Sequence, residues 1–470
     1  MESDKARALR IVQNSELAHP GLPLVEAFLN DAADGDQAAR YLLQTYADDG
    51  SGTNLTRFLK DWQDLQRLYD LLGAFTTSFH RDLLKDQPPE NQIRNHWTLS
   101  NDIAIAFSRG AIKLEKLEGT EYDILYNHIG GKSPPFYQGR EYVWKCDLID
   151  HSNSGVETPN PDLVEIHSRF SRALKWSEIA TKINSRPCLR QSRNTDCSSF
   201  GRTISTIFLA LWSKFPDSIR FQTYRILRTI GYRLYGSTTT GIQRLPFGMY
   251  LKHGPEFHAK RHAGEFNALK VVGSQTCIPI PRPIDLLLTD TESFLVTSRI
   301  KGGPVGLAID ECSDEEMQRM AQDLRSWVAE LHAIKMDKHP KYAITNATGG
   351  PCLDYRIGGD PVGPFHTERE FSESLQLGIL PDLVHRTDHR IVFTHADLNM
   401  RNILVNNGRI SGIVDWENAG WFPEYWEYTK CHFGVMYSKR WLKMIEVVFE
   451  NKYEAELAIE KQYWAYNSAW

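Results

Sequence analysis

The stretch that decides the fold is THADLNMRN, residues 394–402, followed closely by IVDWE, residues 413–417. Together they place Asp397, Asn402 and Asp415 between apolar runs that read as short strands. In such a set, one carboxylate can orient and deprotonate an attacking hydroxyl, while an amide oxygen and a second carboxylate can hold Mg²⁺. Each residue type alone is also common in the turns next to strands. The combination favours phosphoryl transfer.

The size and composition of the chain indicate a globular protein with more than one domain. At 470 residues the chain is too long for one ordinary core, so two domains, or a domain with a long extension, are expected. A content of 41% hydrophobic and 24% charged residues is typical of soluble proteins. The net charge of -5 gives no indication of nucleic acid as a partner.

The cysteines and the apolar segments indicate the cellular compartment of the protein. The 7 cysteines are scattered and form no Cys-x-x-Cys pair, which favours reduced thiols over a zinc site or a disulfide framework. No secretory signal is visible at the start of the sequence. The most apolar stretch, residues 204–212, is too short to cross a bilayer and reads as a buried helix. We therefore expect a cytoplasmic protein without a membrane partner.

Residues 1–200 form a first region of unknown function, which we expect to be largely helical with loops. A helical pattern covers about 20–85, and its apolar stripe favours a core-facing surface over a partner-binding one. The stripe consists of Leu55, Phe58, Leu59, Trp62, Leu65, Leu68, Tyr69 and Leu72. Beyond it the pattern weakens, although 122–126 and 141–144 have the composition of strands.

The rest of the chain has the element order of a two-lobed kinase. We expect helices at 203–214 and 218–235, a β-hairpin at 242–254, a helix carrying Glu265, and a buried strand at 293–298. A capping-box start at Ser313 and Glu316 opens a further helix. Accordingly, 201–300 is expected to be a small lobe with preceding helices, and 301–470 a mostly helical lobe.

The pattern His395-x-Asp397-x-x-x-x-Asn402 followed by Asp415 resembles the motifs of the aminoglycoside phosphotransferase family, which is itself similar to the protein kinases. The resemblance covers roughly residues 225–470. The segment DWENAGWFPEYWE that begins at Asp415 looks like the branch common in filamentous fungi. The fold implied is α+β: a two-lobed protein-kinase-like fold with a small β-containing N-lobe and a mostly helical C-lobe, preceded by a mainly helical N-terminal region.

The resemblance also implies roles for the motif residues. Asp397 would be the catalytic base that faces a substrate hydroxyl, and His395 would brace the loop by hydrogen bonds. Asn402 and Asp415 would bind Mg²⁺, which prefers oxygen ligands and bridges the phosphates of ATP.

Lys252 and Glu265 match the nucleotide-binding lysine of the family and its carboxylate partner. The ammonium would touch the α- and β-phosphates of ATP. A lysine at a strand end and a glutamate on a helix are each ordinarily solvated, but their order upstream of Asp397 favours the pair.

The strand that ends at Val296-Thr297-Ser298-Arg299-Ile300 resembles the interlobe hinge. Backbone N–H and C=O groups of Ser298 and Ile300 would bond adenine, and Thr297 would flank the base. A plain buried strand running into a turn gives the same pattern.

The glycine-rich segment departs from the family. Kinases usually cover the phosphates with a glycine loop, whose N–H groups bond the oxygens. The candidate here, GSTTTG at 236–241, is short and close to the lysine strand, so an ordinary turn is favoured. With such a loop, either ATP would bind weakly or its phosphates would be held chiefly by Lys252 and Mg²⁺.

The resemblance implies an acceptor that is a small molecule carrying a hydroxyl. Asp354 and Glu417 would suit an amine-bearing acceptor, although solvated charges look the same in sequence. The aromatic residues between Trp416 and Tyr428 would either line a pocket for a flat or cationic molecule or pack in the core.

Two further interpretations stay open beside an ATP-dependent phosphotransferase. One is a catalytically weak or inactive kinase-like protein that binds nucleotide or a partner; the unclear phosphate loop favours it, and the intact Asp397, Asn402, Asp415 and Lys252 oppose it. The other, compatible with both, is that residues 1–200 form a module that binds a protein partner.

Overall fold

The computed structural model describes the following residues, to which all statements below refer: 2–46, 53–62, 112–116, 121–126, 144–147, 161–185, 212, 214–236, 241–336, 341–354, 356, 360–375, 385–433 and 438–466. The chain divides into two units. The first is Met1–Cys188 with Asp310–Asp314, and the second is Leu189–Ile309 with Glu315–Trp470. Most of the helix expected at 203–214, and the end of the apolar stripe from Leu65 to Leu72, lie outside the described residues.

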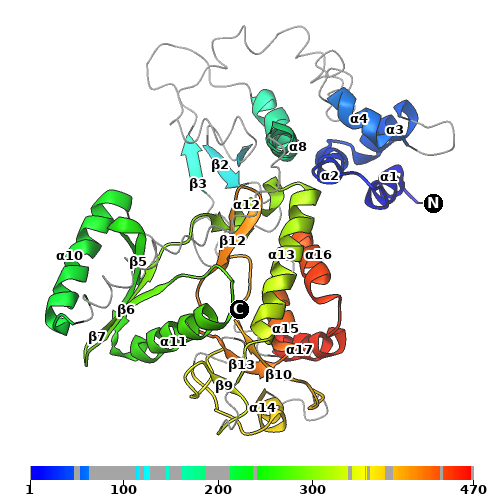
Figure 1. Cartoon of the computed structure of the whole chain (residues 1–470). Coiled ribbons are helices and arrows are strands. Elements are labelled where there is room, and N and C mark those ends of the chain that lie inside the picture. Colours follow the sequence, from blue (N-terminus) through cyan, green and yellow to red (C-terminus); the bar gives the residue numbers. More distant parts are fainter. Residues whose placement is uncertain are drawn as a thin grey trace. The chain divides into compact units, whose positions relative to one another are not determined.

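The first unit combines helices with a small antiparallel sheet of order β1-β2-β3 (Figure 1). Its elements are α1 (Asp4–Gln13), α2 (Gly21–Asp31), α3 (Gly35–Thr45), α4 (Leu55–Trp62), β1 (Ile112–Lys116), β2 (Glu121–Tyr126), β3 (Trp144–Asp147) and α8 (Pro161–Ser185). The strand expected at 122–126 is therefore present; of the one expected at 141–144 only Trp144, the first residue of β3, is among the described residues.

Helices α1 and α3 of the first unit begin at side-chain caps, and the helices of the unit share one hydrophobic core. Ser3 accepts a hydrogen bond from the N–H of Ala6 at the start of α1, and Asp34 does the same for α3. Leu55 and Phe58 are buried in this core. The core-facing interpretation of the stripe is thus confirmed for the part of α4 that the structure describes.

The small lobe of the second unit contains a four-stranded antiparallel sheet of order β4-β5-β7-β6 (Figure 1). Its elements are α10 (Asp217–Tyr235), β4 (Ile242–Leu245), the 3-10 turn η4 (Pro246–Gly248), β5 (Met249–Pro255), η5 (Glu256–His258), α11 (Ala259–Gln275), β6 (Pro283–Leu288) and β7 (Glu292–Ser298). Helix α10 precedes the sheet in the sequence, and α11 connects β5 to β6. Lys252 lies in β5, paired with Ile242 on one side and Leu295 on the other.

Helix α10 packs against the edge strand β4. Phe221 and Tyr224 of α10 are buried in a cluster with Leu245 and Leu251. The approach is so close that a Cβ atom at Gly231 would collide with the carbonyl oxygen of Arg244. Glycine is therefore required where the helix meets the strand backbone. Among the described residues, β4 is an edge strand of this sheet, and no further strand pairs with its outer side.

The large lobe is mostly helical and carries two short antiparallel sheets, β12-β11-β8 and β10-β13-β9. Its elements are β8 (Gly303–Pro304), α12 (Val305–Ala308), η6 (Ile309–Glu311), α13 (Asp314–His332), β9 (Thr345–Asn346), α14 (Glu368–Leu375), β10 (Ile391–Thr394), β11 (Ile403–Asn406), β12 (Arg409–Ile413), β13 (Gly420–Pro423), α15 (Trp426–His432), α16 (Lys439–Phe449) and α17 (Glu454–Tyr466). The two-lobed α+β fold is thus confirmed. None of the described helices combines the length and the apolar character that a membrane span requires.

Candidate active site

One buried carboxylate binds the backbone of the loop between β10 and β11. Glu427 of α15 accepts hydrogen bonds from the backbone N–H groups of His395 at 2.6 Å, Ala396 at 3.2 Å and Leu398 at 3.2 Å. Burial raises the pKa of Glu427, and the nearby His395 and the N–H donors oppose that shift. Ala396 adopts a left-handed conformation with φ of 58°. The backbone bonds hold this turn in place against its conformational cost.

His395 connects the loop to the segment that carries Asp415. Its Nε2 lies 3.0 Å from the carbonyl oxygen of Val414, and its Nδ1 lies 3.2 Å from the N–H of Asp397. Because a carbonyl only accepts and an N–H only donates, Nε2 is placed to donate to Val414 and Nδ1 to accept from Asp397. The ring also stands edge-on to Trp416, with the centroids 4.6 Å apart. These contacts connect His395 to the backbone on both sides, as expected of a residue that stabilises the loop.

Asp397 projects from the loop and is held at both carboxylate oxygens. Oδ1 accepts from Nδ2 of Asn399 at 3.1 Å, and Oδ2 accepts from Nδ2 of Asn402 at 3.0 Å. The ammonium of Lys430 lies 3.2 Å from Oδ1. The side chain is 12% exposed, so one part of the carboxylate still reaches solvent.

Asn402 is oriented by the same loop. Its Nδ2 donates to the backbone oxygen of Asp397 at 2.8 Å as well as to Oδ2. Both amide protons are thus engaged, so the side-chain oxygen is the group with remaining capacity to bind a ligand. The N–H of Val414 donates to the backbone oxygen of Asn402 at 2.9 Å, which places Asn402 beside the segment that leads into Asp415.

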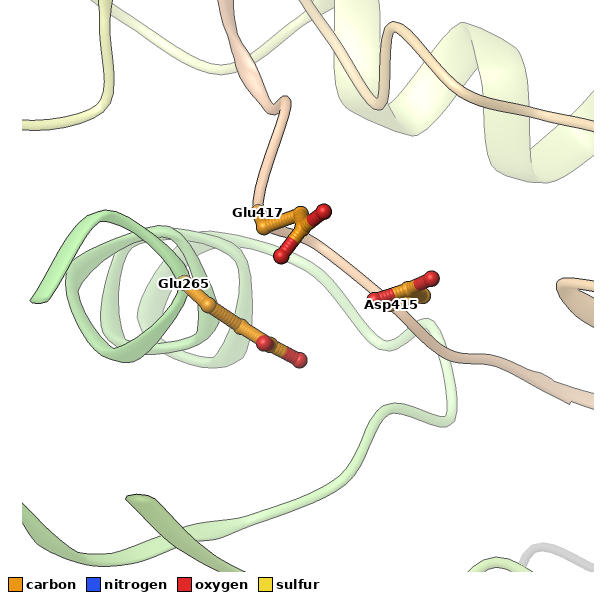
Figure 2. Close-up of side chains that lie close together, drawn as sticks. All are labelled: Glu265, Asp415 and Glu417. Carbon is orange, nitrogen blue, oxygen red and sulfur yellow. The ribbon is translucent and has the colours of Figure 1, made fainter. Parts of the chain in front are cut away.

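A second cluster joins the two lobes around Lys252. Its Nζ lies 2.6 Å from Oε2 of Glu265 and 2.5 Å from Oδ1 of Asp415. The predicted pair of Lys252 with Glu265 is therefore present, and Asp415 is a further partner. Glu417 joins the group: one oxygen each of Glu265, Asp415 and Glu417 lies within 4.8 Å of the others, and Figure 2 shows the three carboxylates pointing toward a common space.

The charges of this cluster depend on one another. Burial alone would lower the pKa of Lys252, but the carboxylates of Glu265, Asp415 and Glu417 raise it above its usual value. Burial raises the pKa of Glu265 to about 7, against the opposing effect of Lys252. For Asp415 burial is the largest single effect and acts in the same direction, but the charge and hydrogen bond of Lys252, with smaller effects of His395 and Arg401, together hold the pKa below its usual value. The ammonium and the Asp415 carboxylate are thus both charged at neutral pH.

One of the backbone donors expected at the hinge is already used. The N–H of Ser298 donates to the carbonyl oxygen of Arg282 at 2.9 Å, because β6 and β7 remain paired up to that residue. Of the backbone groups considered at Ser298, this N–H is therefore engaged within the protein. Thr297 is buried within β7, and Ile300 lies just beyond the strand, where the backbone has left the sheet.

The segment proposed as a phosphate loop lies largely outside the described residues, which include only its ends. Gly236 ends α10 with φ of 72°, and Gly241 leads into β4 with φ of 83°. Both are left-handed conformations that favour glycine.

Asp354 does not serve as a contact for an acceptor, and of the two interpretations of the aromatic residues the structure confirms packing in the core. Asp354 is fully buried and receives Arg356 at two points, 2.7 and 3.1 Å, so it is not available to an amine. The aromatic residues pack in the core, since all except the half-buried Trp421 are at most 1% exposed. The buried ones are Trp416, Phe422, Tyr425, Trp426 and Tyr428.

The structure adds two residues that the sequence did not single out, Glu427 and Lys430. Both lie on α15, one helical turn apart, and both approach the loop of Asp397. Charged residues on a short helix usually face water, and no local pattern separates these from solvated ones. Glu417 was considered as a contact for an acceptor, whereas the structure places it with Glu265 and Asp415.

We expect Glu427→Ala to lower the free energy of unfolding by roughly 3 kcal/mol or more, because three buried N–H groups lose their acceptor. Chemical denaturation measures this. Glu424→Ala is the matched control: its partner Arg390 is 71% exposed, so its removal should cost about 1 kcal/mol or less. Equal effects of the two substitutions would show that Glu427 does not hold the loop.

With two lobes, a lysine–glutamate pair between strand and helix, and an Asp/Asn loop facing them, the second unit defines a protein of the kinase-like class. Residues 238–457 match the profile of the phosphotransferase enzyme family, APH.

Two curated relatives are aminoglycoside 3'-phosphotransferases. The protein of Escherichia coli is 25% identical over 186 residues, which cover 38% of this chain and 65% of the relative. The protein of Enterococcus faecalis is 25% identical over 167 residues, covering 33% and 58%. The matched part of the chain thus spans less than two thirds of the length of either relative.

Among solved structures, similar chains include two aminoglycoside phosphotransferases. A thermostable mutant of APH(4)-Ia in ternary complex with ADP and hygromycin B is 14% identical, with a TM-score of 0.36, and the match covers 50% of this chain and 88% of that one. The gentamicin complex of APH(2")-IIa is 14% identical, with a TM-score of 0.34, and the match covers 47% and 76%.

Proposed function

We propose that the protein transfers the γ-phosphoryl group of ATP to a hydroxyl of a small molecule. The observation that carries this proposal is the pairing of Lys252 with both Glu265 and Asp415, at 2.6 and 2.5 Å, in the same unit as the loop that presents Asp397 and Asn402. Phosphoryl transfer is catalysed mainly by positioning and electrostatic stabilisation, and this arrangement supplies both.

The donor nucleotide would be held by groups of the small lobe. Lys252 would bind the α- and β-phosphates, with Glu265 keeping the ammonium in place. Since the N–H of Ser298 is engaged, adenine would be held by the carbonyl group of Ser298 and the backbone N–H of Ile300, with Thr297 beside it. The short glycine segment contributes little in this proposal, so Lys252 is the main phosphate contact.

The residues present fit a magnesium ion. The amide oxygen of Asn402 and the carboxylate of Asp415 are hard oxygen donors, and Glu417 offers a further carboxylate beside Asp415. When bound, Mg²⁺ neutralises charge on the phosphates and aligns them for transfer. Asn402 would keep its oxygen toward the ion because Asp397 holds its nitrogen.

Asp397 would orient the acceptor hydroxyl and accept its proton as the oxygen attacks the γ-phosphorus. His395 and Glu427 would act on the loop backbone only. The curated relatives are named for aminoglycosides; here we propose the wider class of small hydroxylated molecules, because Asp354, the residue considered for an amine, is buried against Arg356.

We further propose that residues 201–300 and 301–470 are the two lobes of the enzyme, in the cytoplasm, and that 1–200 is a separate region available to a protein partner. The branch common in filamentous fungi remains a proposal for its origin.

Release of ADP tests the function directly. The whole chain is incubated with ATP and Mg²⁺ and a panel of amino sugars, choline-like amines and other hydroxylated metabolites, with EDTA in parallel. ADP release that requires both an acceptor and the metal supports the proposal. Nucleotide binding without turnover for any acceptor would support the non-catalytic alternative.

We expect Lys252→Met to raise the KM for ATP by roughly tenfold or more and to lower kcat, because the phosphates lose their main cation. Lys260→Met, on the exposed side of α11, is the matched control and should leave both constants unchanged. Initial rates at varied ATP concentration measure the effect. Equal kinetics of the two variants would exclude Lys252 from nucleotide binding.

A further inference from the structure

Lys430 of α15 is a buried cation next to the proposed catalytic base. Its side chain is only 5% exposed, and its Nζ lies 3.2 Å from Oδ1 of Asp397 and 3.9 Å from Oδ1 of Asp354. A buried ammonium must be paired, since its desolvation is otherwise uncompensated. Either Asp397 or Asp354 must therefore form the ion pair with Lys430.

Asp354 is already satisfied by other groups. Arg356 binds it through Nε and a terminal nitrogen, and the N–H of Trp426 Nε1 donates to Oδ2 at 3.0 Å. The Arg356 guanidinium also lies over the ring of Trp426, with 3.8 Å between Cζ and the centroid. Arg356 therefore balances the charge of Asp354, which leaves the shorter contact, with Asp397, as the ion pair of Lys430.

The turn of α15 that precedes Lys430 is fixed at two points. Thr429 accepts a hydrogen bond from Arg356 at 2.8 Å, and Glu427 binds the backbone of the loop that bears Asp397. One turn of α15 thus holds the loop backbone through Glu427 and the loop carboxylate through Lys430.

The contacts also distinguish the two oxygens of Asp397. Each oxygen accepts one amide hydrogen bond, Oδ1 from Asn399 and Oδ2 from Asn402, but only Oδ1 also lies next to the ammonium of Lys430, at 3.2 Å. A carboxylate oxygen accepts about two hydrogen bonds. Oδ1 is therefore occupied by the amide of Asn399 and by the ion pair, and Oδ2 is the oxygen with the capacity to accept a further hydrogen bond.

We propose that Lys430 is a positioning residue that locks the Asp397 carboxylate so that Oδ2 receives the proton of the acceptor hydroxyl. The inference rests on the proposed function. In the step, the hydroxyl oxygen forms a bond to the γ-phosphorus and its proton passes to Oδ2. The bond from the γ-phosphorus to the bridging oxygen breaks, and ADP leaves with the electron pair.

The first experiment measures kcat and the KM for ATP with the acceptor that releases ADP fastest. We expect Lys430→Met to lower kcat on the order of 10²-fold, because a loosely held base is misplaced, with the KM for ATP changed less than about twofold. Lys430→Arg, which keeps the charge, should recover part of the loss, and Lys430→Gln should lie between Arg and Met. Lys452→Met, an exposed ion-pair lysine of the same lobe, is the control.

The second experiment does not depend on activity. Melting temperatures are compared for Lys430→Met, Asp397→Asn and the double variant. Lys430→Met should lower Tm by roughly 5–10 °C, because it leaves a carboxylate buried without its cation. Adding Asp397→Asn should restore part of that loss.

The two experiments separate the possible failures. Additive changes of Tm would overturn the ion pair, and a kcat unchanged by Lys430→Met would overturn the positioning role. A wild-type chain without turnover, but with coupled melting temperatures, would overturn the phosphotransferase function while leaving the ion pair of Lys430 with Asp397 established.

Discussion

Asp397→Asn is expected to reduce turnover by about 10³-fold or more, while the chain stays folded. The amide keeps the shape of the side chain but cannot accept the proton of the hydroxyl, and proton transfer with correct orientation supplies acceleration of this size. ADP release under saturating ATP and acceptor measures the loss. Since binding of ATP does not use Asp397, the affinity for nucleotide should stay close to that of the wild type.

Asp388→Asn is the matched control, because this aspartate is exposed in the same lobe and precedes β10. It should be fully active. Turnover by Asp397→Asn within tenfold of the wild type would remove Asp397 from the reaction and would leave the loop of 395–402 as a structural turn.

Asp415→Ala is expected to have an effect of similar size, about 10³-fold or more, for a different reason. The substitution removes a proposed metal ligand and one of the two close carboxylates of Lys252. The measurement is turnover over a wide range of Mg²⁺ and Mn²⁺ concentrations. Excess metal should recover little of the activity, because the remaining oxygen donors cannot place the ion correctly.

Asp290→Ala, in the exposed turn between β6 and β7, is the control for a lost surface carboxylate. Full activity of Asp415→Ala at ordinary Mg²⁺ would exclude the metal assignment, and with it the role proposed for Asn402. A recovery that requires only more ATP would instead indicate that Asp415 serves Lys252 and not the ion.

The parts of the site that were predictable from the sequence are those set by local spacing. The loop from His395 to Asn402 is flanked by β10 and β11 as expected, and Lys252 meets Glu265 because a strand and the following helix bring them together. These relations depend on few residues, all close in sequence or in consecutive elements.

What the sequence could not give depends on contacts between distant segments. The N–H of Ser298 is lost to Arg282 because the register of β6 extends to that residue. Burial of the aromatic residues around Trp426, and of Asp354 beneath them, follows from packing that no periodicity encodes. Glu427 and Lys430 approach the loop only through the tertiary placement of α15.

The carboxylates shown in Figure 2 have a consequence for the order in which ligands arrive. Three acidic side chains surround a single ammonium, so this corner of the unliganded protein carries surplus negative potential. A nucleotide without a counterion, itself polyanionic, would be repelled there. A divalent cation would be attracted and would reverse the local sign. Productive encounters should therefore be those in which the metal precedes the nucleotide or travels with it.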